Sequence, residues 1–432
     1  MNGNSLIKKL FEKFYFNFYL FLLIFTPLLF VTNTGELFEF PKTFFIYYAA
    51  LLCLMVYVID MISNKTWISR PSLTVLFYVA VFILTTITSM HFYTSLWGYY
   101  TRFNDGLMSV LAFFALYYVA KNKLTSTDIS RLSNAILLPI IPVALYGIAQ
   151  HFGLFEGRVV FGEKSDRVYS TFGQPNWLAQ YLVMLLPVVL YKTFYAIKPW
   201  FWYTILILGY TCLWFTFSMS GFAGFGASFA IGLFYLFRQL GFKRVRVKIG
   251  FLLIYILMLA VLFPGILEKR LYDIRQDLFG MSVSPVYASS ENLNANPSKY
   301  KLSDAGFIRK YAWVGTWNLI KSSSKNFILG TGPETYPYSF QPFRPVELNY
   351  SSEWSYLFNK PHNYYLEIWA ESGLLGLVAY GILFFKVSKN QTIDKRLGLV
   401  GFAITNIFGW PVVATTLVFW FWLIEVEEEQ NA

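Results

Sequence analysis

The chain of 432 residues is 56% hydrophobic and 21% aromatic, and only 14% of its residues are charged. Soluble domains carry about 25% charged residues, so this composition excludes a soluble globular protein and indicates one that lies in a membrane. The formal charge of +11 reflects basic residues beside membrane segments rather than a nucleic-acid-binding surface. Membrane lipids are therefore expected partners, and nucleic acid is not.

Apolar runs of about 20 residues, the length that crosses a bilayer, recur from Phe14 to Phe421. We expect an all-α, polytopic membrane protein with about twelve transmembrane helices. The last two expected spans are short and meet at Pro411, which opposes continuation of a helix, and one kinked helix is the alternative. The twelve ranges are 14–31, 43–62, 72–90, 106–120, 132–151, 176–191, 199–218, 221–238, 248–264, 363–385, 397–409 and 411–425.

The distribution of basic residues predicts how these spans are oriented, because Lys and Arg near membrane ends stay on the cytoplasmic side. With the amino terminus inside, nineteen basic residues flank the inner ends of the spans, whereas the short outer loops carry five. Residues 1–264 then form a membrane domain of nine helices. Residues 265–361 form one large extracytoplasmic loop, and residues 362–432 carry helices ten to twelve and an acidic tail inside.

The large loop contains two stretches with helical periodicity. The first continues the ninth span as an amphipathic helix, through Leu267, Leu271, Ile274 and Leu278. Residues 276–301 are rich in Ser, Asn and Pro, which predicts irregular structure. After Ser303 and Asp304, apolar positions again repeat every three to four residues, as in a helix at the membrane interface. These positions are Ile308, Ala312, Gly315 or Thr316, and Leu319.

One membrane span carries a stripe of small residues. Gly224, Ser228 and Gly232 recur every four residues, so they share one face of the helix expected at 221–238. Small side chains on one face allow a neighbouring helix to approach closely. The stripe therefore predicts a tight helix–helix contact rather than a chemical site.

The chain has three histidines, His91, His151 and His362, all expected near the outer membrane face. The neighbourhoods of His91 and His151 offer no further support for a chemical role, whereas Asn363 follows His362 and Glu367 lies near the same helix entrance. A second carboxylate, Glu371, lies four residues further and shares that helix face. Carboxylates beside apolar residues are costly without partners or water, which indicates a polar cavity. An anchoring role at the interface stays open for His362.

Basic residues of the outer segments offer a second kind of chemistry. Arg167 precedes a Gly-Gln-Pro-Asn turn, ending at Asn176, that leads into the sixth span. Arg309, Arg344 and Lys360 lie in the large loop. The planar, permanently charged fork of arginine suits phosphate, so these residues are candidates for binding a lipid diphosphate, with solvated surface as the alternative for Arg167. No metal-ligand cluster or phosphate-binding loop is evident, so no metal and no cofactor are expected.

Successive motifs resemble those of one family. The chain contains, in this order, "RVYSTFGQPNWLAQYL", "IRKYAWVGTW" followed by "ILGTGPETY", and "HNYYLEIWAESGLLGL". These stretches are similar to successive signatures of the O-antigen ligase and polymerase family. The resemblance covers roughly residues 160–425. It implies a C-type membrane glycosyltransferase that uses a polyprenyl-diphosphate-linked glycan without nucleotide or metal.

The resemblance also implies roles for individual residues. Arg167 and Arg309 correspond to diphosphate-binding arginines, and His362 corresponds to the catalytic histidine. Many members of the family carry an arginine just after a serine at the end of the seventh span, but "SMSGFAG" has none. Either Arg344 or Lys360 substitutes for it, or the donor binds differently.

The sequence therefore predicts a glycosyltransferase of the bacterial cytoplasmic membrane, active on the extracytoplasmic face. It would move a polyprenyl-diphosphate-linked oligosaccharide onto a hydroxyl of a lipid core, a growing glycan or a protein. A transporter or flippase of such glycans is the alternative, but the polar groups lie at the outer face rather than at mid-membrane. The expected catalytic residues are His362, Arg167 and Arg309, and the expected substrate-binding residues are Arg344, Lys360, Asn363, Glu367 and Asn176.

Overall fold

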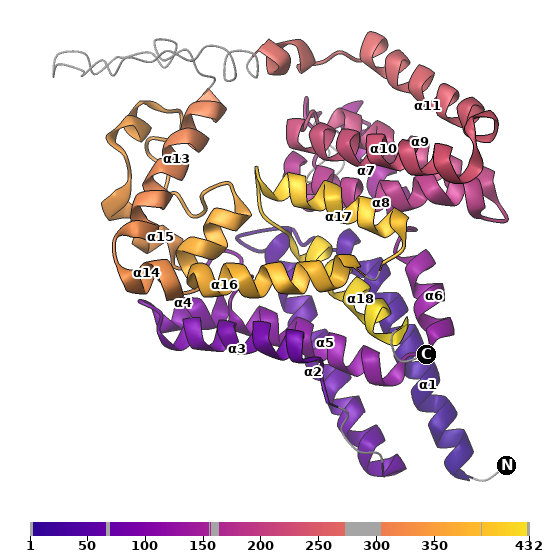
Figure 1. Cartoon of the computed structure of the whole chain (residues 1–432), viewed down its shortest axis with the longest axis horizontal. Helices are drawn as coiled ribbons and strands as arrows, with labels where there is room; N and C mark the ends of the chain where they lie inside the picture. Colours follow the sequence, from indigo (N-terminus) through magenta and orange to yellow (C-terminus); the bar gives the residue numbers. More distant parts are fainter. Residues whose placement is uncertain are drawn as a thin grey trace.

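The computed structural model describes residues 3–65, 70–154, 156, 164–272, 304–389 and 391–429. Within these ranges every regular element is a helix (Figure 1), so the predicted all-α class is confirmed. The predicted irregular segment at 276–301 lies outside the described residues, as do Ile274 and Leu278 of the expected amphipathic continuation.

Each expected span coincides with helical structure. The first nine correspond to α1 (Gly3–Phe25), α2 (Glu39–Asn64), α3 (Leu73–Ile87), α5 (Leu107–Lys123), α6 with α7 (Ser126–Ala135 and Ile140–His151), α8 (Pro175–Tyr195), α9 (Pro199–Phe215), α10 (Met219–Leu240) and α11 (Phe242–Leu262). The last three correspond to α16 (Tyr364–Lys389), α17 (Ile393–Asn406) and α18 (Val413–Glu429). The two final helices are separate, joined by residues 407–412, rather than one kinked helix.

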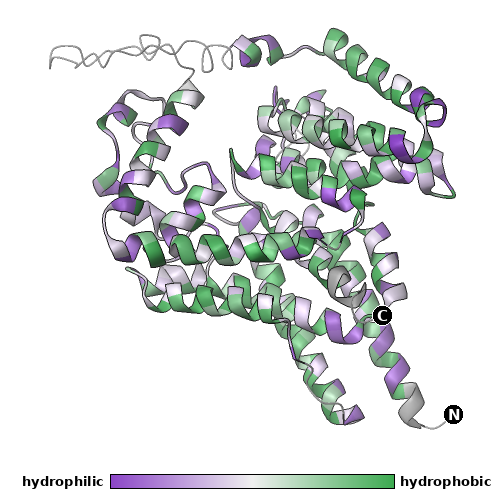
Figure 2. Cartoon of the chain, in the orientation of Figure 1, coloured by the Kyte–Doolittle hydropathy of each residue, from purple (hydrophilic) through white to green (hydrophobic). Residues whose placement is uncertain are grey.

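By length and composition, six described segments are long and apolar enough to cross a membrane, and apolar residues predominate along most of their length (Figure 2). α3 and the first part of α18 are apolar but shorter. The protein is therefore a multi-pass membrane protein, while the count of twelve spans stays a prediction. The six segments are Glu39–Asn64, Ser126–His151, Pro175–Tyr195, Met219–Leu240, Phe242–Leu262 and Tyr364–Lys389.

Helix α8 is the central helix of the bundle. Within its apolar window, 89% of the residues are buried, and it packs against α9, α10 and α17. Pro175 occupies its first position, where the missing amide hydrogen costs nothing and the fixed φ angle suits a helix. Helix α8 thereby carries Asn176 and Trp177 at its amino-terminal end, deep among the other helices.

The small-residue stripe packs α10 against α17, as predicted. A Cβ atom added at Gly224 would lie 2.9 Å from the carbonyl oxygen of Gly401, and one at Gly232 would lie 3.0 Å from the Leu397 side chain. The Ser228 hydroxyl donates a hydrogen bond of 2.7 Å to the Leu397 carbonyl. The close approach of these two helices is therefore confirmed.

The described part of the large loop folds into helices at one end of the long pair α3 and α16 (Figure 1). They are α13 (Asp304–Lys321), α14 (Ser324–Leu329) and α15 (Tyr336–Ser339). Ile308, Ala312 and Leu319 are buried against Tyr336 and Phe340. The predicted helix is confirmed, but its apolar face covers the loop's own aromatic core and not a membrane interface, because the residues that follow α14 fold back onto it.

Contacts between loops agree with the predicted sidedness. Lys192, which is expected inside, donates at 2.5 Å to Asn134, which lies at the inner end of the span expected at 132–151. Lys42 donates to the Thr171 carbonyl at 2.8 Å, and both are expected outside. The orientation relative to the membrane stays a prediction.

Candidate active site

A small polar cavity lies at the amino-terminal end of α8. Residues that are far apart in sequence meet there. The amino-terminal ends of α8 and α10, the segment before α16 and the segment after α17 all lie at this cavity. His362 and Asn176, both predicted as site residues, lie in its wall. The full lining is Gln174, Asn176, Trp177, Gln180, Ser220, His362, Thr405, Phe408, Gly409 and Trp410.

His362 is held in an unusual backbone conformation at this cavity. Its φ of 55° lies in the left-handed region, which is rare for residues other than glycine and concentrates at functional sites. The Trp313 indole donates to the Pro361 carbonyl at 3.0 Å and fixes the preceding residue. The ring centroid of His362 lies 5.4 Å from that of Trp410. This geometry makes the imidazole part of the cavity wall.

The electrostatic surroundings keep the His362 imidazole neutral. Burial, followed by the positive charges of Arg309 and Arg102, lowers the pKa of His362 from 6.5 to about 4. A neutral imidazole has one nitrogen that can accept a proton at physiological pH. The imidazole can therefore accept a proton, and its role as the catalytic base stays a prediction.

Arg167 adjoins the cavity through Asn176. Its Nε donates to the Thr216 carbonyl and its Nη2 donates to the Asn176 Oδ1, each at 3.0 Å. The Ser218 hydroxyl donates to the same oxygen at 2.9 Å. These bonds hold the guanidinium plane at the start of α8 and α10, where the sequence expected a phosphate-binding group.

Arg167 lies in a strongly positive environment. Burial, and then the charges of Arg270 and Arg309, lower the pKa of Arg167 to about 10. Arg309 also acts on His362, so it links the two predicted catalytic positions electrostatically. Mutual repulsion among guanidinium groups favours an anion between them, because arginine forms strong paired hydrogen bonds with phosphate. The structure thus brings Arg167, Arg309 and His362 to one region.

Sequence reasoning missed Arg102 as a site residue and counted it only among the outer basic groups. Its guanidinium carbon lies 4.7 Å from the Trp177 ring and 5.7 Å from the Trp410 ring. Both rings line the cavity with His362. The segment "WGYYTRFNDG" carries no motif that points to phosphate, so only the fold could place this arginine beside the site.

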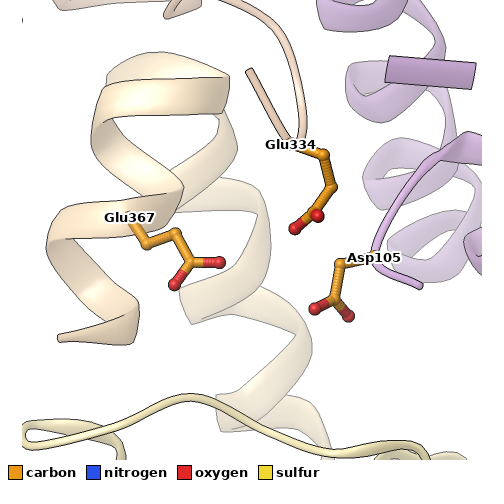
Figure 3. A group of neighbouring side chains, drawn as sticks. All are labelled: Asp105, Glu334 and Glu367. Atoms are coloured by element: carbon orange, nitrogen blue, oxygen red, sulfur yellow. The ribbon is translucent and has the colours of Figure 1, made fainter. Parts of the chain in front are cut away.

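The side chain of Lys360 is surrounded by carboxylates, which is not the environment expected of a phosphate ligand. Its ammonium donates to Glu367 at 2.5 Å, to Glu334 at 2.6 Å and to Asp105 at 3.3 Å. The carboxyl groups of these three residues converge on one place (Figure 3). Burial opposes the charge of Lys360, but the carboxylates outweigh it and hold its pKa well above 10.5. A phosphate would have to compete with three carboxylates for this ammonium.

The same carboxylates form a grouping that the sequence did not show. Oxygens of Asp105, Glu334 and Glu367 lie within 4.8 Å of one another, a spacing that could hold a metal ion. Burial, partly offset by Lys360, raises the pKa of Asp105 to about 6. The three residues come from distant segments, which is why no metal motif was visible. The expectation that no metal is needed stays a prediction.

Two motifs of the large loop and α16 dock on each other. Glu371 accepts hydrogen bonds from the Glu334 amide at 2.8 Å and the Tyr336 amide at 3.0 Å. Gly373 has a φ of 66°, and a Cβ atom there would lie 2.1 Å from the Ile328 carbonyl oxygen. The motif "ILGTGPETY" therefore fits against the break in α16, which positions Glu334 beside Lys360.

Asn363 and Arg344 have local partners. The Asn363 Oδ1 accepts from the amides of Tyr365 at 3.0 Å and Leu366 at 3.1 Å, which caps α16. Arg344 donates to the Trp354 carbonyl at 2.7 Å and lies over the Phe358 ring. Their contacts hold the loop and helix in place, so the geometry gives neither a contact with the cavity.

The other two histidines have partners away from the cavity. The His91 Nδ1 accepts a hydrogen bond from the Thr94 amide at 3.3 Å and caps α4 (Phe92–Trp97). The His151 ring stacks on Phe215 with 3.8 Å between centroids. Both contacts are structural, in agreement with the distinction drawn from the sequence.

Comparison with known proteins supports the resemblance carried by the motifs. Residues 203–381 match the family described as O-antigen ligase. The match includes Arg309, Lys360 and His362, whereas the Arg167 motif precedes it. No curated protein matches the chain. The protein is thus a multi-pass membrane protein whose residues 203–381 are similar to the O-antigen ligase family.

Proposed function

We propose that the protein transfers an oligosaccharide from a polyprenyl diphosphate to an acceptor hydroxyl at the extracytoplasmic face of the bacterial cytoplasmic membrane. The observation that carries this proposal is a neutral His362 in the wall of a polar cavity, with Arg167 and Arg309 beside it. A base for a hydroxyl and arginines for a diphosphate are the groups that such a transfer needs.

The arginines bind and stabilise the donor's leaving group. As the bond between the anomeric carbon and the diphosphate oxygen breaks, negative charge grows on that oxygen. Arg167, fixed by the Thr216 carbonyl and Asn176, and Arg309 place positive charge where this charge develops. Preorganised donors of this kind act strongly in a site with little water. The guanidinium groups supply the charge that a metal ion supplies in other transferases, so the reaction is expected to be independent of metal.

His362 prepares the acceptor. The hydroxyl oxygen forms a bond to the anomeric carbon while the polyprenyl diphosphate leaves with its electron pair, and the hydroxyl proton passes to the imidazole. A positioned base contributes about 100-fold to 10,000-fold to such a step. Lys360 and Glu367 hold the segment that carries His362, through the ion pair of 2.5 Å between them, and Asn363 caps the helix that follows.

A reconstitution experiment tests this proposal. The purified protein is placed in liposomes with a polyprenyl-diphosphate-linked glycan on one side and candidate acceptors of the lipid, glycan and protein classes. Transfer to one acceptor class supports the proposal and identifies the acceptor. Movement of the intact donor across the bilayer without transfer would instead establish the transporter alternative and overturn the enzyme.

A further inference from the structure

The loop that carries Arg102 is tightly constrained. Phe103 and Asp105 have φ angles of 53° and 61°, a left-handed conformation that costs free energy in residues other than glycine. A Cβ atom on Gly98 would lie 2.4 Å from the Asn104 carbonyl oxygen. The Tyr47 hydroxyl donates to the Phe103 carbonyl at 2.7 Å. The loop is therefore held in one strained shape, which fixes where Arg102 points.

Arg102 has hydrogen-bond donors to spare. Its guanidinium lies over the Trp177 and Trp410 rings, and within the described ranges its side chain donates to no carbonyl, carboxylate or hydroxyl. It stands beside the His362 cavity rather than in its lining. Its charge nevertheless reaches His362 and helps to lower the pKa of that imidazole. A guanidinium has five N–H donors, so this one is suited to an oxyanion.

The indole of Trp410 supplies a second donor at the same place. Trp410 is 5% exposed, and its Nε1 is buried without a hydrogen-bond partner among the described residues. A buried N–H group without an acceptor is costly, and Trp410 lines the cavity with His362. The buried indole N–H requires an acceptor, and the half-buried guanidinium over its ring can donate to the same acceptor.

We propose that Arg102 and the Trp410 indole form a second oxyanion subsite of the cavity, which binds the phosphate of the donor diphosphate that Arg167 and Arg309 do not hold. This inference rests on the proposed function. A diphosphate has two phosphate groups and presents more acceptor oxygens than one pair of arginines can satisfy. The subsite would make the protein specific for a diphosphate over a monophosphate, because only the former reaches both sets of donors.

The test compares two lipids. Binding of undecaprenyl diphosphate and undecaprenyl monophosphate to the full-length protein in nanodiscs is measured for the unchanged protein, Arg102→Gln and Trp410→Phe. Arg131→Gln is the matched control, because Arg131 is an exposed arginine of α6. We expect Arg102→Gln to weaken diphosphate binding by about ten- to hundredfold, the effect of a charged hydrogen bond, with monophosphate binding unchanged. Trp410→Phe keeps the ring and should lose several-fold, again for the diphosphate alone.

Each outcome of this comparison either supports or overturns the proposed subsite. Equal loss for both lipids in Arg102→Gln, or the same loss in Arg131→Gln, would show only general electrostatic attraction and overturn the subsite. Unchanged diphosphate binding in Arg102→Gln would overturn it as well, while leaving the donor assignment intact. If the unchanged protein does not bind the diphosphate at all, the proposed function fails together with this inference. Should Arg102→Gln not fold, Trp410→Phe decides by the same comparison of lipids.

Discussion

The His362 cavity and the Lys360 cluster are two polar sites that share one aromatic wall. Arg102 lies 5.7 Å from the Trp410 ring and Lys360 lies 5.8 Å from it. At the cavity, Arg102, Arg167 and Arg309 bring three positive charges to one region. At the cluster, one ammonium is surrounded by three carboxylates. The first site is suited to an anion, whereas the ammonium of the second already has carboxylate partners.

The loop between Gly98 and Gly106 supplies both sites. Arg102 points to the two tryptophans, and Asp105, three residues later, accepts from Lys360. Lys360 in turn lies two residues before His362. The Lys360 cluster therefore anchors the segments that carry the His362 cavity. We infer that Arg102, which donates to no described acceptor, is available to a substrate, whereas the ammonium of Lys360 is already bound by carboxylates.

The largest effect should come from the cavity itself. Substituting His362 by alanine should reduce transfer by about 100-fold to 10,000-fold, while binding of the lipid donor persists. Transfer assays in proteoliposomes, alongside donor binding, measure both. His91→Ala and His151→Ala are controls and should keep most activity, because their contacts are structural. An active His362→Gln protein would rule out proton abstraction by this residue.

The next largest effect should come from a substitution in the Lys360 cluster, which should lower the free energy of unfolding. Lys360→Met removes the ammonium and leaves buried carboxylates without compensation, which should cost about 3–5 kcal/mol of unfolding free energy. Thermal unfolding in nanodiscs measures it. The double variant Lys360→Met, Glu367→Gln removes one of the uncompensated charges and should recover part of the loss. Full stability of Lys360→Met combined with lost donor binding would make Lys360 a phosphate ligand and remove the contrast between the two sites.

Replacing the arginines of the cavity by lysine tests whether phosphate binding needs the planar shape of the guanidinium group or only its charge. Arg167→Lys and Arg309→Lys should each lower transfer by about ten- to hundredfold, nearly as much as alanine, because a point charge cannot reproduce the planar fork. Expression and thermal stability serve as controls for folding. Full activity in both lysine variants would show that any basic group suffices.

The pH dependence tests the neutral state of His362. Only the unprotonated imidazole can accept a proton, so kcat/KM should fall as the pH drops through the lowered pKa of about 4, rather than near the ordinary value of about 6.5. Removing a positive neighbour with Arg102→Gln should raise this pKa and move the acid limb to higher pH. A limb near 6.5 in the unchanged protein would mean that the cavity does not depress the pKa of His362.

The smallest expected effect concerns metal ions. Lys360 already supplies positive charge among Asp105, Glu334 and Glu367, so incubation with EDTA should leave transfer unchanged within experimental error. Transfer measured before and after chelation, and after Mg²⁺ is added back, gives the result. Loss of activity that Mg²⁺ restores would identify the cluster as a metal site, since carboxylate oxygens suit this ion.

Much of the candidate site could be predicted from sequence order alone. His362, Arg167 and Arg309 lie in motifs whose residue types already indicate a base and phosphate ligands, and the structure brings them to one region. Apolar length and the small-residue stripe likewise predicted the helices and a close contact of α10 with a neighbouring helix, because helix periodicity and close packing follow from local spacing. These features depend on residues that are near one another in the chain.

Only the tertiary structure decided the partners of the charges. Lys360 resembles a phosphate ligand in sequence, but Asp105, Glu334 and Glu367 reach it from separate segments. Arg102 resembles an ordinary loop residue, but the strained loop sets it over Trp177 and Trp410. Electrostatic energy depends on distance and burial in space, and neither is encoded by spacing along the chain. Sequence therefore determined which chemical groups are present, and folding determined which of them are left to act on a substrate.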